Sequence, residues 1–160
     1  QGIMTGYTGG DMKPDQAITR AELIKMVLKA IEETTSGVQY SAVFSDVSTV
    51  DWFWAYVLKA YTLGFVSGYS DGSFAPNNSI NRAEALKIIL EAFEVTLVST
   101  SDVGSTFDDV SSSDWYGRYV QTAYDEGLVS GYDDGTFGPG NSLTRGEAAK
   151  ILDTAIQKWK

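Results

Sequence analysis

The sequence predicts a mainly α-helical fold built from tandem helix–loop–helix repeats, and two observations carry this prediction. A glycine-rich stretch occurs three times in one register, as GYTGGDMKPDQAITRAE at residues 6–22, GYSDGSFAPNNSINRAE at 68–84 and GYDDGTFGPGNSLTRGE at 131–147. Each copy runs directly into apolar residues that recur about every 3.6 positions, which indicates an amphipathic helix. One repeat alone has too little apolar surface to close a core, so we expect the repeats to pack around a shared axis.

The first repeat is expected to span residues 1–33 and to lack its first helix. Residues 1–7, QGIMTGY, match LGFVSGY at 63–69 and EGLVSGY at 126–132, where this segment follows the end of a helix. Residues 20–33 are predicted to form a helix. One face of that helix carries Leu23, Ile24, Val27, Leu28 and Ile31. Residues 34–43 are interpreted as a polar linker, in which a short strand is the alternative to coil.

The second repeat, residues 44–94, supplies both helices. Asp51 is expected to be the N-cap of the first, and Gly64 to end it. The residues expected on its inner face are Trp52, Ala55, Tyr56, Ala60 and Leu63. The second helix is predicted over residues 82–93, with Ala85, Leu86, Ile89 and Phe93 inward. A β-prone segment, 95–98, then leads into a linker, and the third repeat, residues 107–160, copies the same order.

The end of each glycine-rich stretch has the sequence of a helix N-terminus. Thr19 with Glu22 and Thr144 with Glu147 have the spacing of a capping box, and residues 81–84 repeat it with asparagine as the cap. An arginine therefore falls at the first helical position in every copy. The N-terminus of a helix favours anions, because its first N–H groups lack intrahelical partners and the helix dipole is positive there.

These residues carry a resemblance to a known family. The pattern GYxDGxFxP…TRAE, preceded by FxDV and DW at 44–47 and 51–52, and again at 107–110 and 114–115, resembles the S-layer homology (SLH) repeat. The second and third copies match it nearly end to end, and the first matches from residue 2 onward. The resemblance implies that the three repeats form one SLH domain, a pseudo-threefold, three-lobed bundle at the bacterial cell surface.

Composition narrows the classes of function. A net charge of −9 argues against nucleic acid as a partner, because nucleic-acid affinity comes from basic patches. The chain has no cysteine and no histidine, which removes thiolate chemistry and the commonest general base and metal ligand. No apolar run reaches the length of a membrane span, so no membrane insertion is expected. We expect no cofactor and no enzymatic activity, since the glutamates at 22, 84 and 147 are better explained as capping-box members.

A calcium site in the aspartate-rich loops is also not expected. With Gly135 at the sixth position of an EF-hand loop, the twelfth would be Asn141 where a bidentate glutamate is required. The sequence therefore predicts no metal.

The strongest binding candidates are the three arginines, Arg20, Arg82 and Arg145. Their residue type and position alone favour a structural ion pair with a loop aspartate such as Asp71 or Asp134. The alternative is recognition of a ligand carboxylate, which a guanidinium holds with two parallel hydrogen bonds. The resemblance favours this second role, because the matching arginine of SLH domains is implicated in holding a pyruvylated cell-wall sugar.

Further candidates surround the arginines in sequence. Trp52 and Trp115 could each offer a face to a sugar ring, but we favour core packing for both. Tyr69 and Tyr132, beside the turn, are candidates either for the wall of a ligand site or for anchors of the loop. Gly68 and Gly131 are expected to serve the turn, where their N–H groups could also reach a ligand, and Asp71 and Asp134 are candidates for contact with sugar hydroxyls. The first copy departs most from the pattern, which makes Arg20 the doubtful binder of the three.

The resemblance implies a non-catalytic module that anchors a surface protein to an anionic, pyruvylated secondary cell-wall polysaccharide. The alternative is a self-assembling subunit of an S-layer or filament. This alternative is based on the incomplete first repeat, because a missing helix would leave the apolar side chains of Ile24, Val27 and Leu28 exposed. Residues upstream of Gln1 or a neighbouring chain would then fill a groove beside those residues and Ile3.

Overall fold

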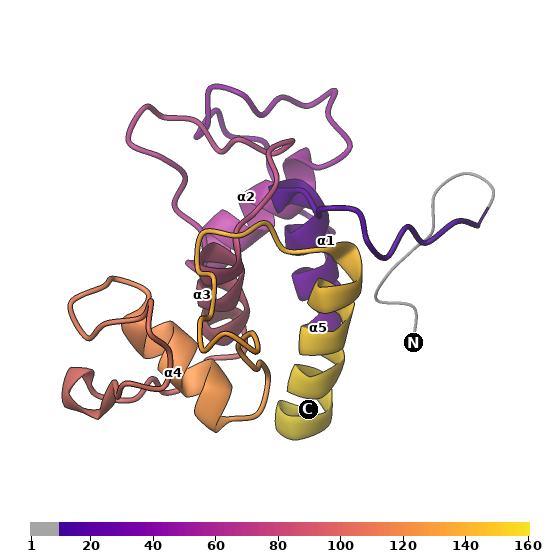
Figure 1. Ribbon diagram of the computed structural model, residues 1–160. Helices are drawn as coiled ribbons and strands as arrows, with labels where there is room; N and C mark the ends of the chain where they lie inside the picture. The colour runs from indigo at the N-terminus through magenta and orange to yellow at the C-terminus, as the bar shows by residue number, and fades with distance from the viewer. Residues whose placement is uncertain (1–9) are drawn as a thin grey trace.

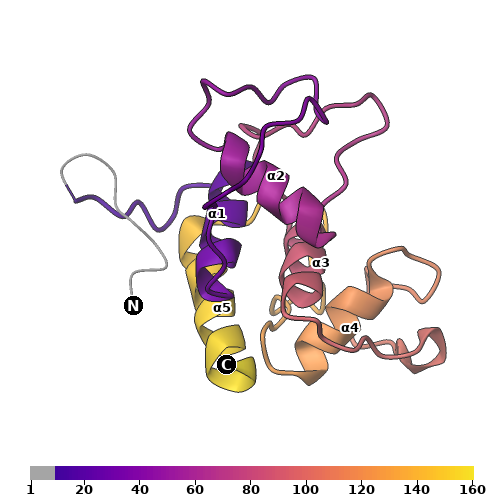
Figure 2. The same cartoon turned by 180° about the vertical axis from the view of Figure 1, so that it is seen from behind.

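Five α-helices and one short 3-10 helix make up the regular structure of the computed structural model, which describes residues 10–160 (Figures 1 and 2). The α-helices are α1 (Arg20–Ala30), α2 (Trp54–Leu63), α3 (Arg82–Ala92), α4 (Gly117–Asp125) and α5 (Arg145–Trp159), and the 3-10 helix is η1 (Thr100–Asp102). Within residues 10–160 no strand forms. The short strand considered at 34–43 is therefore absent, and the β-prone segment at 95–98 is irregular and is followed by η1. The alignment of residues 1–7 with helix ends lies outside the described residues.

The second helix of each repeat begins at its arginine, as the capping pattern predicts. Thr19 and Thr144 form complete capping boxes with the glutamates three residues later, so the local sequence alone fixes where α1 and α5 start. Asn81 caps α3 through its side-chain oxygen, which accepts from the backbone N–H of Glu84. The carboxylate of Glu84 is instead bonded to Tyr69 and paired with Arg20.

The three repeats close into a ring through the residues just before these helices. The N–H of Ile18 donates to the carbonyl of Leu143, that of Leu143 donates to Ile80, and that of Ile80 donates back to Ile18. Each of the three side chains is at most 1% exposed, so the ring surrounds the centre of the core. This cyclic order gives the pseudo-threefold arrangement that the family resemblance implies, and antiparallel bridges at 17–144, 19–79 and 81–142 flank it.

In the second and third repeats, the first helix packs on the second helix of the repeat before it. Helix α2 packs against α1, and α4 packs against α3, while α1 and α5 lie side by side in both views (Figures 1 and 2). This order corrects the expectation that the first repeat is short of cover. Ile24 and Val27 are fully buried and Leu28 is 1% exposed, because α2 covers α1.

The helix without such a neighbour among the described residues is α5, and its sequence differs from that of α1 and α3 accordingly. Leu28 of α1 and Leu90 of α3 are buried at matching positions, whereas the matching residue of α5 is the exposed Asp153. One turn earlier, Ile24 and Leu86 correspond to Ala149. This face of α5 is therefore polar and small, whereas the matching face of α1 and α3 is apolar.

The start and the inner face of α2 also differ from the prediction. The helix begins at Trp54, and Asp51 is not its N-cap, because its carboxylate accepts from the N–H and hydroxyl of Ser48 in a preceding turn. The buried face comprises Phe53, just before the helix, with Val57, Leu58 and Ala60. Leu63, expected inward, is exposed at the last turn.

The loops between helices are held by the aspartate of each FxDV motif. Asp109 accepts from the N–H groups of Phe137 and Gly138, at 2.7 and 2.8 Å. Asp46 binds residues 74 and 75 in the same way. These bonds fix the long loop of a repeat to its own first segment and set the position of the aromatic residue that meets the arginine.

Candidate functional site

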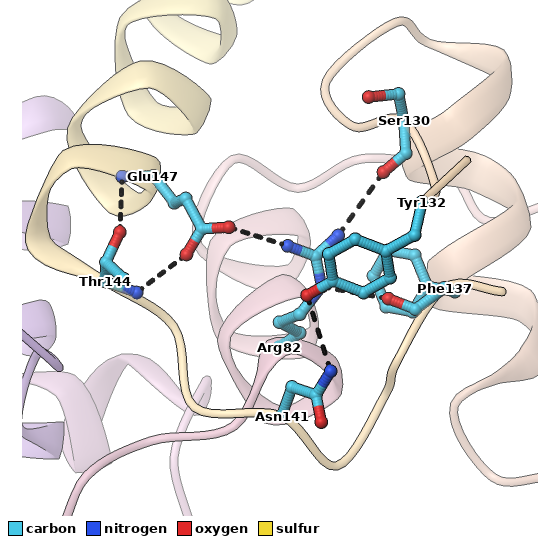
Figure 3. A network of polar contacts seen from close by, with 7 residues as sticks. All are labelled: Arg82, Ser130, Tyr132, Phe137, Asn141, Thr144 and Glu147. Atoms are coloured by element: carbon cyan, nitrogen blue, oxygen red, sulfur yellow. Dashed lines mark hydrogen bonds and ion pairs between the residues drawn. The ribbon is translucent and has the colours of Figure 1, made fainter. Parts of the chain in front are cut away.

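Each repeat contributes one buried arginine, which is bonded to the repeat that follows it. Figure 3 shows the example of Arg82. Its Nε donates to the carbonyl of Phe137 at 3.1 Å, Nη1 to the carboxylate of Glu147 at 3.1 Å, and Nη2 to the carbonyl of Ser130 at 3.3 Å. The guanidinium also lies against the rings of Tyr132 and Phe137, whose centroids are 5.2 and 4.5 Å from its central carbon.

The same arrangement recurs around the ring. Arg20 donates from Nε to the carbonyl of Phe74 and pairs with Glu84 at 3.5 Å. Arg145 donates to the carbonyl of Met12 and pairs with Glu22 at 2.9 Å, so the third repeat is joined to the first. All three arginines are 4–7% exposed. Their shared geometry links each repeat to the next by a partly buried ion pair.

The structure corrects the partner expected for these arginines. Asp71 and Asp134 are exposed and stay within their own turns, where they accept from Ser73 and Thr136. These hydrogen bonds lower the pKa of both carboxyl groups. The true partners are the capping-box glutamates, which the sequence had assigned only a local role. Each of these side chains lies at its own helix N-terminus and also pairs with the arginine of a neighbouring repeat. The three-residue spacing of the capping box predicts the contact with the helix but not the ion pair.

The helix N-termini are not free anion sites. The N–H of Arg82 donates to the carbonyl of Asn141, and the N–H of Ala83 donates to Pro139. The third N–H, that of Glu84, donates to its cap. Helix α1 is bonded in the same way to residues 76 and 78, and α5 to residues 14 and 16. The amides that could hold an anion are therefore used to join the repeats.

Two grooves open beside the buried arginines. We call the first groove A; it has a volume of about 180 Å³. Its lining is drawn from all three repeats: Arg20 of the first, Trp115 of the third, and from the second repeat residues 65–69 with Glu84, Lys87 and Ile88. A groove at the junction of three repeats brings together side chains that are far apart in sequence.

We call the second groove B; it has a volume of about 300 Å³. Its lining comprises Arg82 with residues 127–130, Glu147, Lys150 and Ile151. Lys150 occupies the position that Lys87 has in groove A, one turn after the arginine of its helix. These lysines were not singled out from the sequence, where each resembles an ordinary solvated residue on an amphipathic helix.

The two tryptophans are exposed, contrary to the core packing favoured from the sequence. Trp52 is 52% exposed and Trp115 is 56% exposed. Both precede their helices, and the residue after each of them, Phe53 or Tyr116, points to the core instead. Trp115 lines groove A, whereas Trp52 lies over the ammonium of Lys25 at 5.4 Å. Exposed indole faces of this kind suit the apolar face of a sugar ring.

The tyrosines and glycines of the turn support the arginine. Tyr69 lies over Arg20 at 4.7 Å and donates its hydroxyl to Glu84, and partial burial raises the pKa of this tyrosine. Gly68 has φ of +72°, and a Cβ there would collide with the ring of Phe44. Gly131 meets Phe107 in the same way. Of these residues, Gly68 and Tyr69 also line groove A, so they contribute to the turn and to the groove wall.

Both grooves present cations and a carboxylate, and groove A also presents aromatic faces. Across residues 10–160, no group of three or more acidic, cysteine or histidine side chains is arranged to hold a metal ion. In the same part of the chain, no helix has the length and apolarity needed to cross a membrane. The arrangement fits an anionic or hydroxyl-rich ligand that lies along the junction of neighbouring repeats.

A cyclic set of helix–loop–helix repeats with an arginine at every junction defines a domain built from tandem repeats. A family model described as the S-layer homology domain matches residues 1–24, 43–86 and 106–149, more than half of the chain. The chain therefore belongs to the S-layer homology domain family.

Three relatives are similar to this chain, two of them over nearly its whole length. It is 36% identical to an amylopullulanase of Thermoanaerobacterium thermosulfurigenes, over 98% of this chain and 8% of that protein. It is 32% identical to a cellulosome-anchoring protein of Acetivibrio thermocellus, over 98% of this chain and 36% of that protein. A surface layer protein of Brevibacillus choshinensis is 36% identical over 57% of this chain and 8% of that protein.

The chain thus spans a minor part of these relatives, and an enzyme name among them describes a much longer protein. What the proteins share with this chain is the S-layer homology domain. The family and the surface and anchoring proteins within it place the chain outside the cell, at the bacterial cell surface.

Proposed function

We propose that this chain anchors a protein to the cell surface by non-covalent binding of an anionic, pyruvylated secondary cell-wall polysaccharide. The observation that carries the proposal is the composition of the grooves. Each combines an arginine and a lysine with a carboxylate, at a junction that only the folded ring creates. The function is not catalytic: the groove side chains bind and orient the polysaccharide and break no bond in it.

The arginine has capacity for a ligand in addition to its structural bonds. A guanidinium has five N–H groups, and three hydrogen bonds from Arg82 stay within the protein. Arg82 and Lys150 both line groove B, so the remaining N–H groups and the ammonium are available there in the proposed complex. In the proposed complex they hold the ligand carboxylate, while Glu147 and the carbonyl of Ser130 accept from sugar hydroxyls.

The aromatic side chains complete the proposed complex. In groove A, Trp115 packs on one face of a sugar ring, and Tyr69 closes the end beside Arg20. The net charge of −9 opposes an anionic ligand only at long range. At moderate salt such a field is screened within about 10 Å, so the cations inside the groove decide the outcome.

The test is cosedimentation with cell-wall sacculi. Purified protein is expected to pellet with sacculi that retain their secondary polysaccharide and to stay in solution with sacculi stripped of it. Pyruvate groups removed from the polysaccharide by mild acid should weaken the pelleting. Equal pelleting with intact and stripped sacculi would show that the polysaccharide is not the ligand.

The alternative of self-assembly rested on uncovered residues in the first repeat. Those residues, Ile24, Val27 and Leu28, are buried against the rest of the chain. The structure gives this alternative no apolar surface at the place where it was expected.

A further inference from the structure

Grooves A and B differ in how the charge of their lysine is compensated. Lys87 of α3 and Lys150 of α5 occupy the same register, and each lines its own groove. Four residues later, on the same helix face, α3 has Glu91 and α5 has Thr154. Residues four apart on a helix are neighbours, so this single position controls what the lysine meets.

In groove A the lysine is neutralised within the protein. Its Nζ lies 2.8 Å from Oε2 of Glu91. The other oxygen of Glu91 accepts from the hydroxyl of Tyr119 on α4 at 2.7 Å, which fixes the carboxylate beside the lysine. Both cations that line groove A are thus held in ion pairs: Arg20 with Glu84, which also lines the groove, and Lys87 with Glu91, which lies just outside the lining.

In groove B no such compensation exists among the described residues. The hydroxyl of Thr154 donates to the carbonyl of Lys150 and is directed at the helix backbone. Lys150 is exposed and has no ion pair or side-chain hydrogen bond within residues 10–160. Arg82 and Lys150 face the single carboxylate of Glu147, so this groove keeps one net positive charge.

The two grooves also differ in their aromatic lining and in their volume. Groove A has the indole of Trp115, whereas the lining of groove B described above has no aromatic side chain. Groove B is also the larger, about 300 Å³ against about 180 Å³. Groove A therefore has an aromatic wall and cations that are paired within the protein, whereas groove B is larger and has one cation that is unpaired within the described residues.

We propose that the two grooves recognise different parts of one polysaccharide: groove B binds the sugar that carries the anionic substituent, through Lys150, and groove A binds a neutral sugar face, through Trp115. This division rests on the proposed anchoring function. The residue four positions after the groove lysine then determines which groove binds the anionic sugar. Glutamate at this position pairs with the lysine, whereas threonine leaves the lysine available to the ligand.

The experiment measures affinity by calorimetry for the purified polysaccharide, with its pyruvate groups and after their removal by mild acid. Lys150→Met should weaken binding of the pyruvylated form by about tenfold and leave the other form unchanged. Thr154→Glu should weaken binding of the pyruvylated form by roughly two- to fivefold, because the new glutamate would form an exposed ion pair with Lys150 and such pairs are worth about that much. Thr154→Gln, matched in shape but uncharged, should have no such effect.

The reciprocal change is made in groove A. Glu91→Gln keeps an acceptor for Tyr119 and removes the charge, so it should raise the preference for the pyruvylated form by a similar factor. Trp115→Ala should weaken both forms alike. Thermal unfolding of every variant establishes that the fold is retained.

The outcomes separate the two proposals. Suppose that the wild-type chain binds the polysaccharide, but Lys150→Met and Thr154→Glu change the affinity for both forms equally or for neither. The proposal of different roles for the two grooves is then wrong, and the anchoring function stands. If the wild-type chain binds neither form, both proposals are wrong.

Discussion

The guanidinium of Arg82 lies 3.1 Å from the carboxylate of Glu147, and these two residues belong to different repeats. The same relation joins Arg20 to Glu84 and closes the ring from Arg145 to Glu22. An arginine that the family resemblance associates with a ligand thus also forms a side-chain ion pair between repeats. Loss of binding in an arginine variant therefore needs a stability measurement beside it.

Replacement of Arg82 by methionine should lower the free energy of unfolding by about 2 kcal/mol. Loss of one partner of a fully buried pair costs about 3–5 kcal/mol, and the half-exposed Glu147 can regain water, which reduces the loss. Chemical denaturation measures the change. Lys158→Met, which removes a cation from the exposed pair with Glu126, is the control and should cost less than about 1 kcal/mol. An equal loss in both variants would contradict a special role for the junction.

Trp115→Ala should change stability by less than about 1 kcal/mol, because an exposed side chain leaves no core cavity behind. Binding of the polysaccharide should nevertheless fall, since the indole forms a wall of groove A. Trp115→Phe, which keeps an aromatic face, should retain most of the binding. A loss of about 3 kcal/mol or more in stability would restore the core assignment made from the sequence.

Gly131→Ala should destabilise the protein strongly, and Gly140→Ala should not. A Cβ at residue 131 would overlap the ring of Phe107 and lie 2.6 Å from the carbonyl oxygen of Thr136, whereas nothing lies within 4 Å of one at residue 140. We expect a loss of about 1–3 kcal/mol for the first variant, the usual cost of overpacking. Melting temperatures of the two variants provide the comparison, and equal values would show that the turn can relax.

Stability should fall at alkaline pH through Tyr119. Burial, with the adjacent Glu91 carboxylate, raises the pKa of this tyrosine from 10.0 to about 12. Because the folded protein holds the proton more tightly, the contribution is fully present below pH 10 and is lost as the pH rises toward 12. Tyr119→Phe should flatten this part of the profile of unfolding free energy against pH. An unchanged slope would assign the effect to other tyrosines.

The helix starts could be predicted because they depend on residues close in sequence. Thr19 with Glu22, and Thr144 with Glu147, specify a cap that forms whatever the surroundings. The repeat register and the mainly α fold follow from the same local signals. The arginine positions at the first residue of α1, α3 and α5 were therefore correct.

The ion-pair partners and the tryptophan exposure could not be predicted in this way. Which carboxylate reaches Arg82 depends on how the third repeat docks on the second, and no spacing within one repeat contains that information. For Trp52 the error came from the helix start: α2 begins two residues later than expected, so Phe53 takes the buried place. The grooves, with Lys87 and Lys150, exist only at junctions between repeats.

The ring closure also bears on how an anchor responds to mechanical tension. The strap at residues 12–18 lies antiparallel to residues 142–146, held by backbone hydrogen bonds from Ile18, Arg145 and Gly146. Tension applied between the two ends of the chain acts on these bonds together with the Arg145–Glu22 pair, before it reaches the helices of the second repeat. Opening of this one junction would release the first repeat from the third and could displace Arg20, which the first repeat contributes to groove A. The force that this junction withstands thus sets an upper limit on the load that an intact domain can transmit to the cell wall.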